Sequence, residues 1–203
     1  MKRLAVGSLA LLPLLALAAP KDGFYVGATL DPINTTDMSV SGFGSDSYDN
    51  DFGFSLIVGY DHLINENFSL GLSVEYNNLG DSSYSDSMYV GMPSLPVISY
   101  KEDISVSGFS ATIRPKFYFT NSPIYISPYV GIGRYEFEVE VSTNVSPTEK
   151  DSINETFIKY GIEVGAQFEN NLMVSAGWKE SFYDDNGIEI DIHGLYVGVG
   201  YRF

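Results

Sequence analysis

The end of the chain alternates strictly between apolar and other residues, and this pattern constrains the fold more than any other feature. Apolar or aromatic residues occupy every second position up to the terminus, namely Leu195, Val197, Val199, Tyr201 and Phe203. Successive side chains of a strand face opposite sides, so the stretch predicts a strand with one apolar face. Beyond the first 20 residues, no apolar run approaches the roughly 20 residues that a membrane-spanning helix needs. The sequence therefore predicts an all-β fold.

Eight stretches with this two-residue period are expected to form strands. They cover residues 24–30, 52–60, 68–76, 109–119, 124–141, 158–168, 172–178 and 194–203. The fifth changes phase at Phe137, which predicts a bulge near Gly133. Long connections (31–51, 79–103, 142–153, 183–190) alternate with tight turns, as in barrels with short periplasmic turns and longer external loops. We expect an eight-stranded antiparallel transmembrane up-and-down β-barrel with both termini in the periplasm.

The N-terminal stretch has the three parts of a secretory signal peptide. Lys2 and Arg3 precede an apolar run from Leu4 to Leu17, and Ala16-Leu17-Ala18 supplies the small residues of a cleavage site. A transmembrane anchor is the alternative, but the run is shorter than about 20 residues and Pro13 interrupts it. We expect residues 1–18 to be the signal peptide and residues 19–203 to be the barrel.

Composition and charge restrict the partners. The chain has no cysteine, so hydrogen bonds rather than disulfides must hold it together in an oxidising compartment. Its formal charge is −15, and −17 without Lys2 and Arg3, which argues against a nucleic-acid partner. The 15 tyrosines and 13 phenylalanines suit aromatic girdles at the membrane interfaces. A soluble β-sandwich would also be rich in aromatic residues.

Two segments resemble bacterial outer-membrane barrels. The tail, Leu-Tyr-Val-Gly-Val-Gly-Tyr-Arg-Phe, resembles their C-terminal signal, and residues 111–119 with 127–133 resemble a hairpin of the outer membrane protein A, opacity-type and outer membrane protein X-like small barrels. The resemblance implies an integral outer-membrane protein in contact with lipids and lipopolysaccharide. It also implies that Tyr201 and Phe203 are recognised by the outer-membrane assembly machinery.

Charged residues occupy the face that the apolar residues leave free. If the apolar faces meet lipid, the lumen receives Glu75, Arg114, Lys116, Lys159, Glu163, Gln167 and Lys179. An eight-stranded barrel has an interior just wide enough for side chains to fill. Counted from the turns, Glu75, Arg114, Glu163 and Lys179 lie at similar depth, which predicts an ion-pair network that closes the lumen. A gate that re-pairs to pass small ions is the alternative.

Candidate catalytic and metal-binding residues are few. His62 falls in a predicted turn, and the triplet His193-Gly194-Leu195 lacks the hydroxyl of the His-x-Ser pair in lipid A deacylases of this architecture. The external loops are acidic and offer oxygen ligands to hard cations, yet solvated loops need no metal. We therefore assign no catalytic residue, cofactor or metal site.

The connection at residues 79–103 is unusually apolar for an external loop. Met88, Tyr89, Val90, Met92 and Leu95 stand among its polar residues, and exposed apolar groups of this density usually mark a contact. They either bind a partner surface or fold over the barrel mouth. The predicted function is non-catalytic, in envelope integrity or surface contact. The alternative is a narrow conduit for ions or for small apolar solutes, as the resemblance to outer membrane protein W implies.

Deletion of Phe203 should lower the amount of assembled protein in the outer membrane, because it removes the terminal residue of the alternating tail. The measurement is the heat-modifiable, folded band in isolated outer membranes. A normal folded level without Phe203 would contradict the assembly-signal hypothesis.

Overall fold

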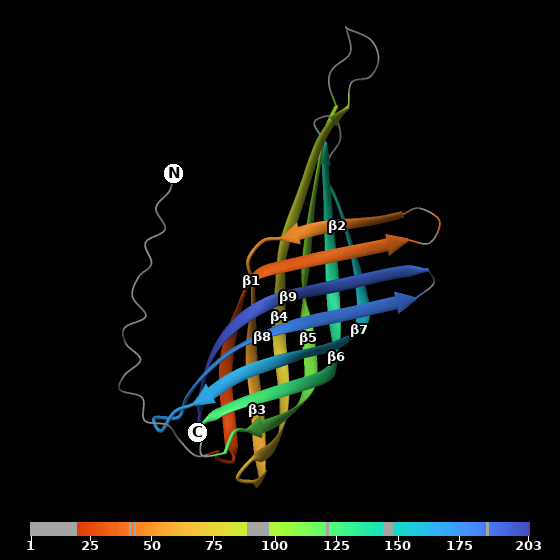
Figure 1. Cartoon of the computed structure of the whole chain (residues 1–203). Coiled ribbons are helices and arrows are strands. Elements are labelled where there is room, and N and C mark those ends of the chain that lie inside the picture. Colours follow the sequence, from red (N-terminus) through yellow and green to blue (C-terminus); the bar gives the residue numbers. More distant parts are fainter. Residues whose placement is uncertain are drawn as a thin grey trace.

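The structure, a computed structural model, describes residues 20–203 apart from residues 41, 43, 89–97, 121, 144–147 and 186. Nine strands are present in this part of the chain (Figure 1). They are β1 (Gly23–Val40), β2 (Gly44–Asn50), β3 (Gly53–Asn65), β4 (Phe68–Met88), β5 (Ile98–Tyr118), β6 (Ile124–Thr143), β7 (Glu149–Gln167), β8 (Leu172–Asp185) and β9 (Ile188–Arg202). The expected signal peptide, residues 1–18, lies outside the described residues.

Eight of these strands close into a ring. Each pairs antiparallel with its neighbour in chain order, and β1 pairs with β9 to complete the barrel. The ninth, β2, pairs only with the outer part of β1, from Asn34 to Val40. The predicted eight-stranded antiparallel up-and-down barrel is therefore confirmed. No helix in the described part of the chain is long and apolar enough to span a membrane.

The barrel has an apolar outside and a polar inside at the end that carries the short turns, residues 66–67, 119–123 and 168–171. We call this the turn end, and the opposite end the extended end. On β6, Val130 and Ile132 are 53% and 63% exposed, while Ser127 and Tyr129 between them and the turn are buried. Because strand side chains alternate, the other strands of the ring likewise place apolar residues outside and polar residues inside. It is the distribution expected of a barrel surrounded by lipid.

The strands are longer than the sequence pattern predicted. Most of the predicted connection 31–51 forms the outer part of β1 and β2, and the predicted connection 79–103 contributes β4 up to Met88 and β5 from Ile98. Residues 142–153 and 183–190 are likewise mostly strand. These segments escaped the prediction because their polar residues break the apolar alternation, although backbone pairing continues through them.

The predicted bulge near Gly133 is wrong. One register holds along β6, from Tyr125 to Thr143 against β5 and from Ile124 to Val141 against β7. The bulges lie instead at Leu30/Ile33, Leu63/Asn65 and Asn78/Asp81. The apolar residues of β6 change parity because they change face. Phe137 points into the barrel, where it is 5% exposed, whereas Ile132 points outward.

This change of face marks an apolar core at the extended end. Its members come from β4, β5, β6, β7 and β9: Leu79, Val106, Tyr135, Phe137, Phe157, Ile190 and Ile192. The Phe137 and Phe157 rings stack at 5.5 Å between centroids. Polar groups replace apolar ones on the outer surface there, so this end has the ordinary inside-apolar arrangement of a protein in water.

The wall divides around this core. Pairing of β3 with β4 stops at Phe54–Asn78, and pairing of β7 with β8 stops at Ile158–Phe182. In Figure 1 the outer parts of β4 to β7 rise together, while β1, β2, β8 and β9 run off to the right. The extended end therefore consists of two groups of strands with the apolar core between them.

Candidate functional site: the charged lumen

The lumen holds every charged residue that the sequence placed there. Glu75 comes from β4, Arg114 and Lys116 from β5, Lys159 and Glu163 from β7, and Lys179 from β8; each is at most 6% exposed. Each occupies a position of inward parity on its strand, opposite the lipid-facing residues. Isolated charges are very costly away from water, so their partners determine what the lumen can do.

A central group joins two carboxylates to two cations. Arg114 Nη2 lies 2.5 Å from Glu75 Oε1, and Nη1 lies 3.2 Å from Glu163 Oε2. Lys159 Nζ contacts the second carboxylate oxygen of Glu75 and lies 2.8 Å from Asn77 Oδ1. Arg114 thus links β5 to both β4 and β7. The two positive and two negative charges of this group compensate each other.

A second group lies nearer the turn end, around Asp61. Lys116 Nζ approaches Asp61 Oδ2 at 2.7 Å, and the Arg202 guanidinium donates to the same oxygen. Arg202 also donates to Gln167 Oε1 at 2.8 Å, and the Gln167 amide donates to the Tyr118 hydroxyl at 2.7 Å. Asp61 and Arg202 were missing from the predicted network. Parity alone points to both, since Asp61 continues the inward positions of β3 and Arg202 those of β9.

A third pair lies toward the extended end. Lys179 Nζ lies 2.6 Å from Asp31 Oδ2, and Asp31 is fully buried. The sequence placed Lys179 at the depth of Arg114 and Glu163, whereas its ion pair is with Asp31. Asp31 escaped detection because it begins the stretch that was predicted to be a loop.

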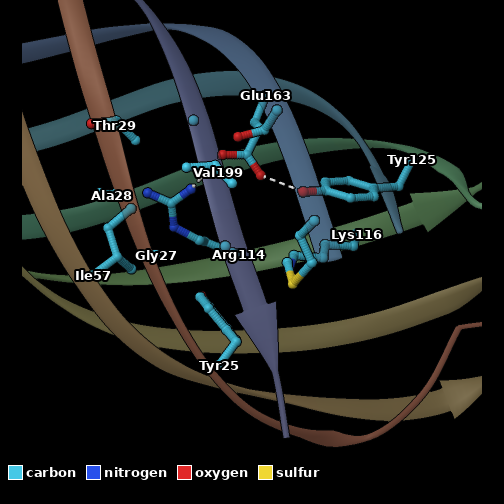
Figure 2. A pocket seen from close by; sticks show the side chains of 14 residues that line it. Tyr25, Gly27, Ala28, Thr29, Ile57, Arg114, Lys116, Tyr125, Glu163 and Val199 are labelled. Atoms are coloured by element: carbon cyan, nitrogen blue, oxygen red, sulfur yellow. Dashed lines mark hydrogen bonds and ion pairs between the residues drawn. The ribbon is translucent and has the colours of Figure 1, made fainter. Parts of the chain in front are cut away.

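Tyrosines fill the space between the charges. Tyr125 and Tyr196 donate to the two oxygens of Glu163 at 2.8 and 2.9 Å, and Figure 2 shows the Tyr125 contact as a dashed line. The Arg114 guanidinium lies 4.2 Å from the ring centroid of Tyr129. A Cβ added to Gly165 would clash with the Tyr125 ring. Glycine at this position therefore makes room for a tyrosine on the neighbouring strand.

Little space remains among these side chains. A cavity of about 30 Å³ lies beside Arg114, Glu163 and Tyr25, against a wall of small residues that includes Gly27 and Ser175. Figure 2 shows Arg114, Glu163 and Tyr125 gathered around it. This volume accommodates one or two water molecules.

The histidines lie away from this network. His62, predicted in a turn, belongs to the last part of β3, and its Nδ1 lies 3.5 Å from Asp22 at an exposed position. His193 Nδ1 lies 3.8 Å from Asp37 on the outer wall, with its side chain 38% exposed. Among the described residues, no group of three or more histidines and carboxylates is arranged to hold a metal ion.

Comparison with known proteins assigns the fold to a family. The model of the outer membrane protein beta-barrel domain matches residues 4–203. A major outer membrane protein from Thermus thermophilus is similar in structure, with 15% identity, coverage of 88% of this chain and 99% of that chain, and a TM-score of 0.53. Ail, the attachment invasion locus protein of Yersinia pestis, shares 18% identity, with 90% and 100% coverage and a TM-score of 0.48. Neisserial surface protein A shares 22% identity, with 89% and 97% coverage and a TM-score of 0.47. No curated protein matches the chain.

Arg114→Ala should destabilise the barrel by about 3–5 kcal/mol, because it leaves two buried carboxylates without their shared cation. Lys150→Ala is the control, since Lys150 contacts Glu138 and Glu140 at an exposed position where ion pairs contribute little. The measurement is the urea midpoint of the refolded protein in lipid vesicles.

Double-mutant cycles of Arg114 with Glu75 and with Glu163 should both give substantial coupling energies, because Arg114 contacts both carboxylates. Coupling near zero in both cycles, with equal midpoints for Arg114→Ala and Lys150→Ala, would contradict an ion-paired lumen.

Proposed function

This chain belongs to the outer membrane protein beta-barrel domain family, and on that premise we propose that it is a closed, non-catalytic barrel that acts at the cell surface through its extended end. The observation that carries this proposal is the filling of the interior. Three groups of ion pairs follow one another along the lumen, and an apolar core succeeds them. A barrel filled in this way offers its outer surfaces, rather than a passage, for function.

The ion pairs fill the lumen and connect the strands across it. Arg114 and Lys159 both bind Glu75, and the three residues come from three strands, so each charge is compensated by fixed neighbours rather than by solvent ions. A conduit requires that ions or solutes replace such contacts on the way through. The alternative function, a narrow channel, would have to use the small wall cavity beside Gly27 and Ser175.

The extended end supplies the surface for contact. Strands β4 to β7 continue well past the lipid-facing apolar residues, and the stretch 79–103 contributes Leu79 to the buried core and exposes part of β4 and β5 to solvent. We infer that a surface ligand is met by this end, while lipopolysaccharide is met by the outer wall of the barrel. The lipid-facing residues, with Tyr201 and Phe203 45% and 73% exposed on the outer wall, remain the proposed contacts with membrane lipid and with the assembly machinery.

The orientation of the barrel in the membrane follows from the position of the short turns. The start of β1, the end of β9 and the three short turns share the turn end, as the pairing of Tyr25 with Arg202 requires. Outer-membrane barrels keep short turns in the periplasm, so we infer that both termini are periplasmic.

Protease added to intact cells should cleave within residues 79–103 and leave the turn at 119–123 intact. Cleavage at 119–123 in intact cells would invert this orientation.

The refolded barrel should be electrically silent in planar lipid bilayers, since no continuous aqueous path is expected through paired charges and an apolar core. The control is confirmation, by heat-modifiable mobility, that the inserted protein is folded. Stepwise conductance from folded protein would overturn the closed-barrel proposal and restore the channel alternative.

A further inference from the structure

One side of β7 has no strand partner at the extended end. Residues 149–166 pair with β6 in a single register, whereas pairing with β8 begins only at Ile158. Within the part of the chain that the structure describes, no strand pairs with residues 149–157 on the side away from β6. The alternate residues Lys150, Ser152, Asn154 and Thr156 are all exposed.

Two facing prolines reveal which backbone groups point to that free side. Pro115 and Pro128 lie opposite each other, and the β5–β6 ladder lacks the pairs between Ile113–Val130 and Phe117–Ile126 without any change of register. This gap is what two absent N–H groups produce when the prolines occupy a hydrogen-bonded pair. The backbone groups of Pro128 therefore point toward β5. Ile162, which lies opposite Pro128 on β7, points its N–H and C=O toward β8.

The direction of the backbone N–H and C=O groups then alternates from residue to residue along β7, because the β6–β7 register is continuous. Every even-numbered residue of β7 points its N–H and C=O away from β6. In the unpaired part these residues are Lys150, Ser152, Asn154 and Thr156. The Ser152 N–H donates to the Asp151 side chain at 2.9 Å, as a donor without a strand partner does. The free side is thus a row of backbone groups ready to pair with another strand.

Three common protections of an exposed edge, namely proline, a bulge and a lysine directed at the edge, are missing here. Edge strands are commonly blocked by proline, a bulge or a lysine that stands at the edge. Residues 149–157 contain no proline, and their pairing with β6 has no bulge. The one lysine, Lys150, binds Glu140 at 2.7 Å and Glu138 at 3.3 Å on β6, so it reaches away from the edge. Hydrogen bonds to these two carboxylates raise the pKa of Lys150, which keeps it charged and held there.

The edge carries negative charge and one apolar residue on its inward-parity face. Asp151, Ile153 and Glu155 alternate there, and Ile153 is 55% exposed. A second copy of the chain would bring the same negative charges to the edge, and like charges in facing positions are destabilising. The pattern instead favours a strand whose alternate residues are basic, apolar and basic.

The rest of the extended end reinforces this preference. Five of the nine basic residues beyond Lys2 and Arg3 are buried in the lumen, and Lys21 precedes β1. Only Lys101, Arg134 and Lys150 of the sequence are left for the extended end, against acidic residues on every strand there. A surface with this imbalance attracts cationic partners and repels anionic ones.

We propose that the free edge of β7, residues 149–157, binds an extended basic polypeptide segment as an added antiparallel strand. Backbone hydrogen bonds supply the attachment, as in other cases of strand addition. Asp151 and Glu155 select basic residues on either side of an apolar residue that covers Ile153. The proposal rests on the proposed function, because it names the partner class of a surface that acts in contact.

The test uses the refolded mature barrel in detergent micelles and a synthetic peptide, Ser-Lys-Thr-Val-Thr-Lys-Ser. Amide exchange at positions 150, 154 and 156 should slow when the peptide is added. A peptide with glutamate in place of both lysines should leave exchange unchanged. Equal protection by the two peptides, or no protection by the lysine peptide, would overturn the proposal.

Matched variants separate backbone pairing from side-chain effects. Asn154→Pro removes an N–H that points to the free side and should abolish peptide binding, while Asn154→Ala keeps the N–H and should bind normally. The double change Asp151→Asn with Glu155→Gln should weaken binding about fivefold, through loss of two facing charge pairs. Asp49→Asn with Glu169→Gln removes the same charge at exposed positions away from the edge and should not. Normal binding by Asn154→Pro would contradict the edge as the site.

Conductance of the same preparation reports on the closed barrel alone. Silent barrels that fail to bind the lysine peptide would overturn the edge proposal and leave the closed-barrel function intact. Conducting barrels would overturn the function whatever the peptide does.

Discussion

The contact of Arg114 with Glu75 and Glu163 is the interaction on which the barrel interior depends. It connects three strands across a lumen in which no charge can be left alone without a large cost. The remaining groups extend the same solution toward each end, with Asp61 shared by Lys116 and Arg202, and Asp31 paired with Lys179. In a closed ring the backbone N–H and C=O groups find hydrogen-bond partners on neighbouring strands. The ion pairs compensate the charges of the interior.

The strands reverse the placement of apolar and charged side chains where they leave the membrane. In the lipid-surrounded part, strands place apolar side chains outside and charges inside; beyond it, the same strands place Phe137 and Phe157 inside and charged residues outside. This reversal needs no irregularity of the backbone, because one register runs through β6 and β7. The division of the wall around the apolar core then leaves strand edges unpaired, which gives the extended end a surface that the closed part lacks.

Much of the fold was predictable because alternation is a direct consequence of strand geometry in lipid. The same pattern placed Glu75, Arg114, Lys116, Lys159, Glu163 and Lys179 in the lumen, although their role in closing it stays a prediction. Alternation failed where the environment changed: the parity change at Phe137 indicated a bulge when the surroundings, not the register, had switched. Asp31 was missed because the sequence assigned residues 31–51 to a loop, and the partner of Lys179 could not be read from sequence. Partner choice depends on side-chain reach across the lumen, which residue spacing does not encode.

The central claim is that the interior is closed to water and solutes, and the absence of cysteine from the chain allows a direct test. Ser127 faces the lumen opposite Glu163, is fully buried, and its hydroxyl has no hydrogen-bond partner among the described residues. Ser127→Cys is therefore a mild change at an informative position, and Ser152→Cys at the exposed β7 edge is its control. We expect a charged, water-soluble thiol reagent to modify Ser152→Cys promptly in the folded barrel and Ser127→Cys only after unfolding. Modification of both at the same rate in the folded protein would contradict a closed interior.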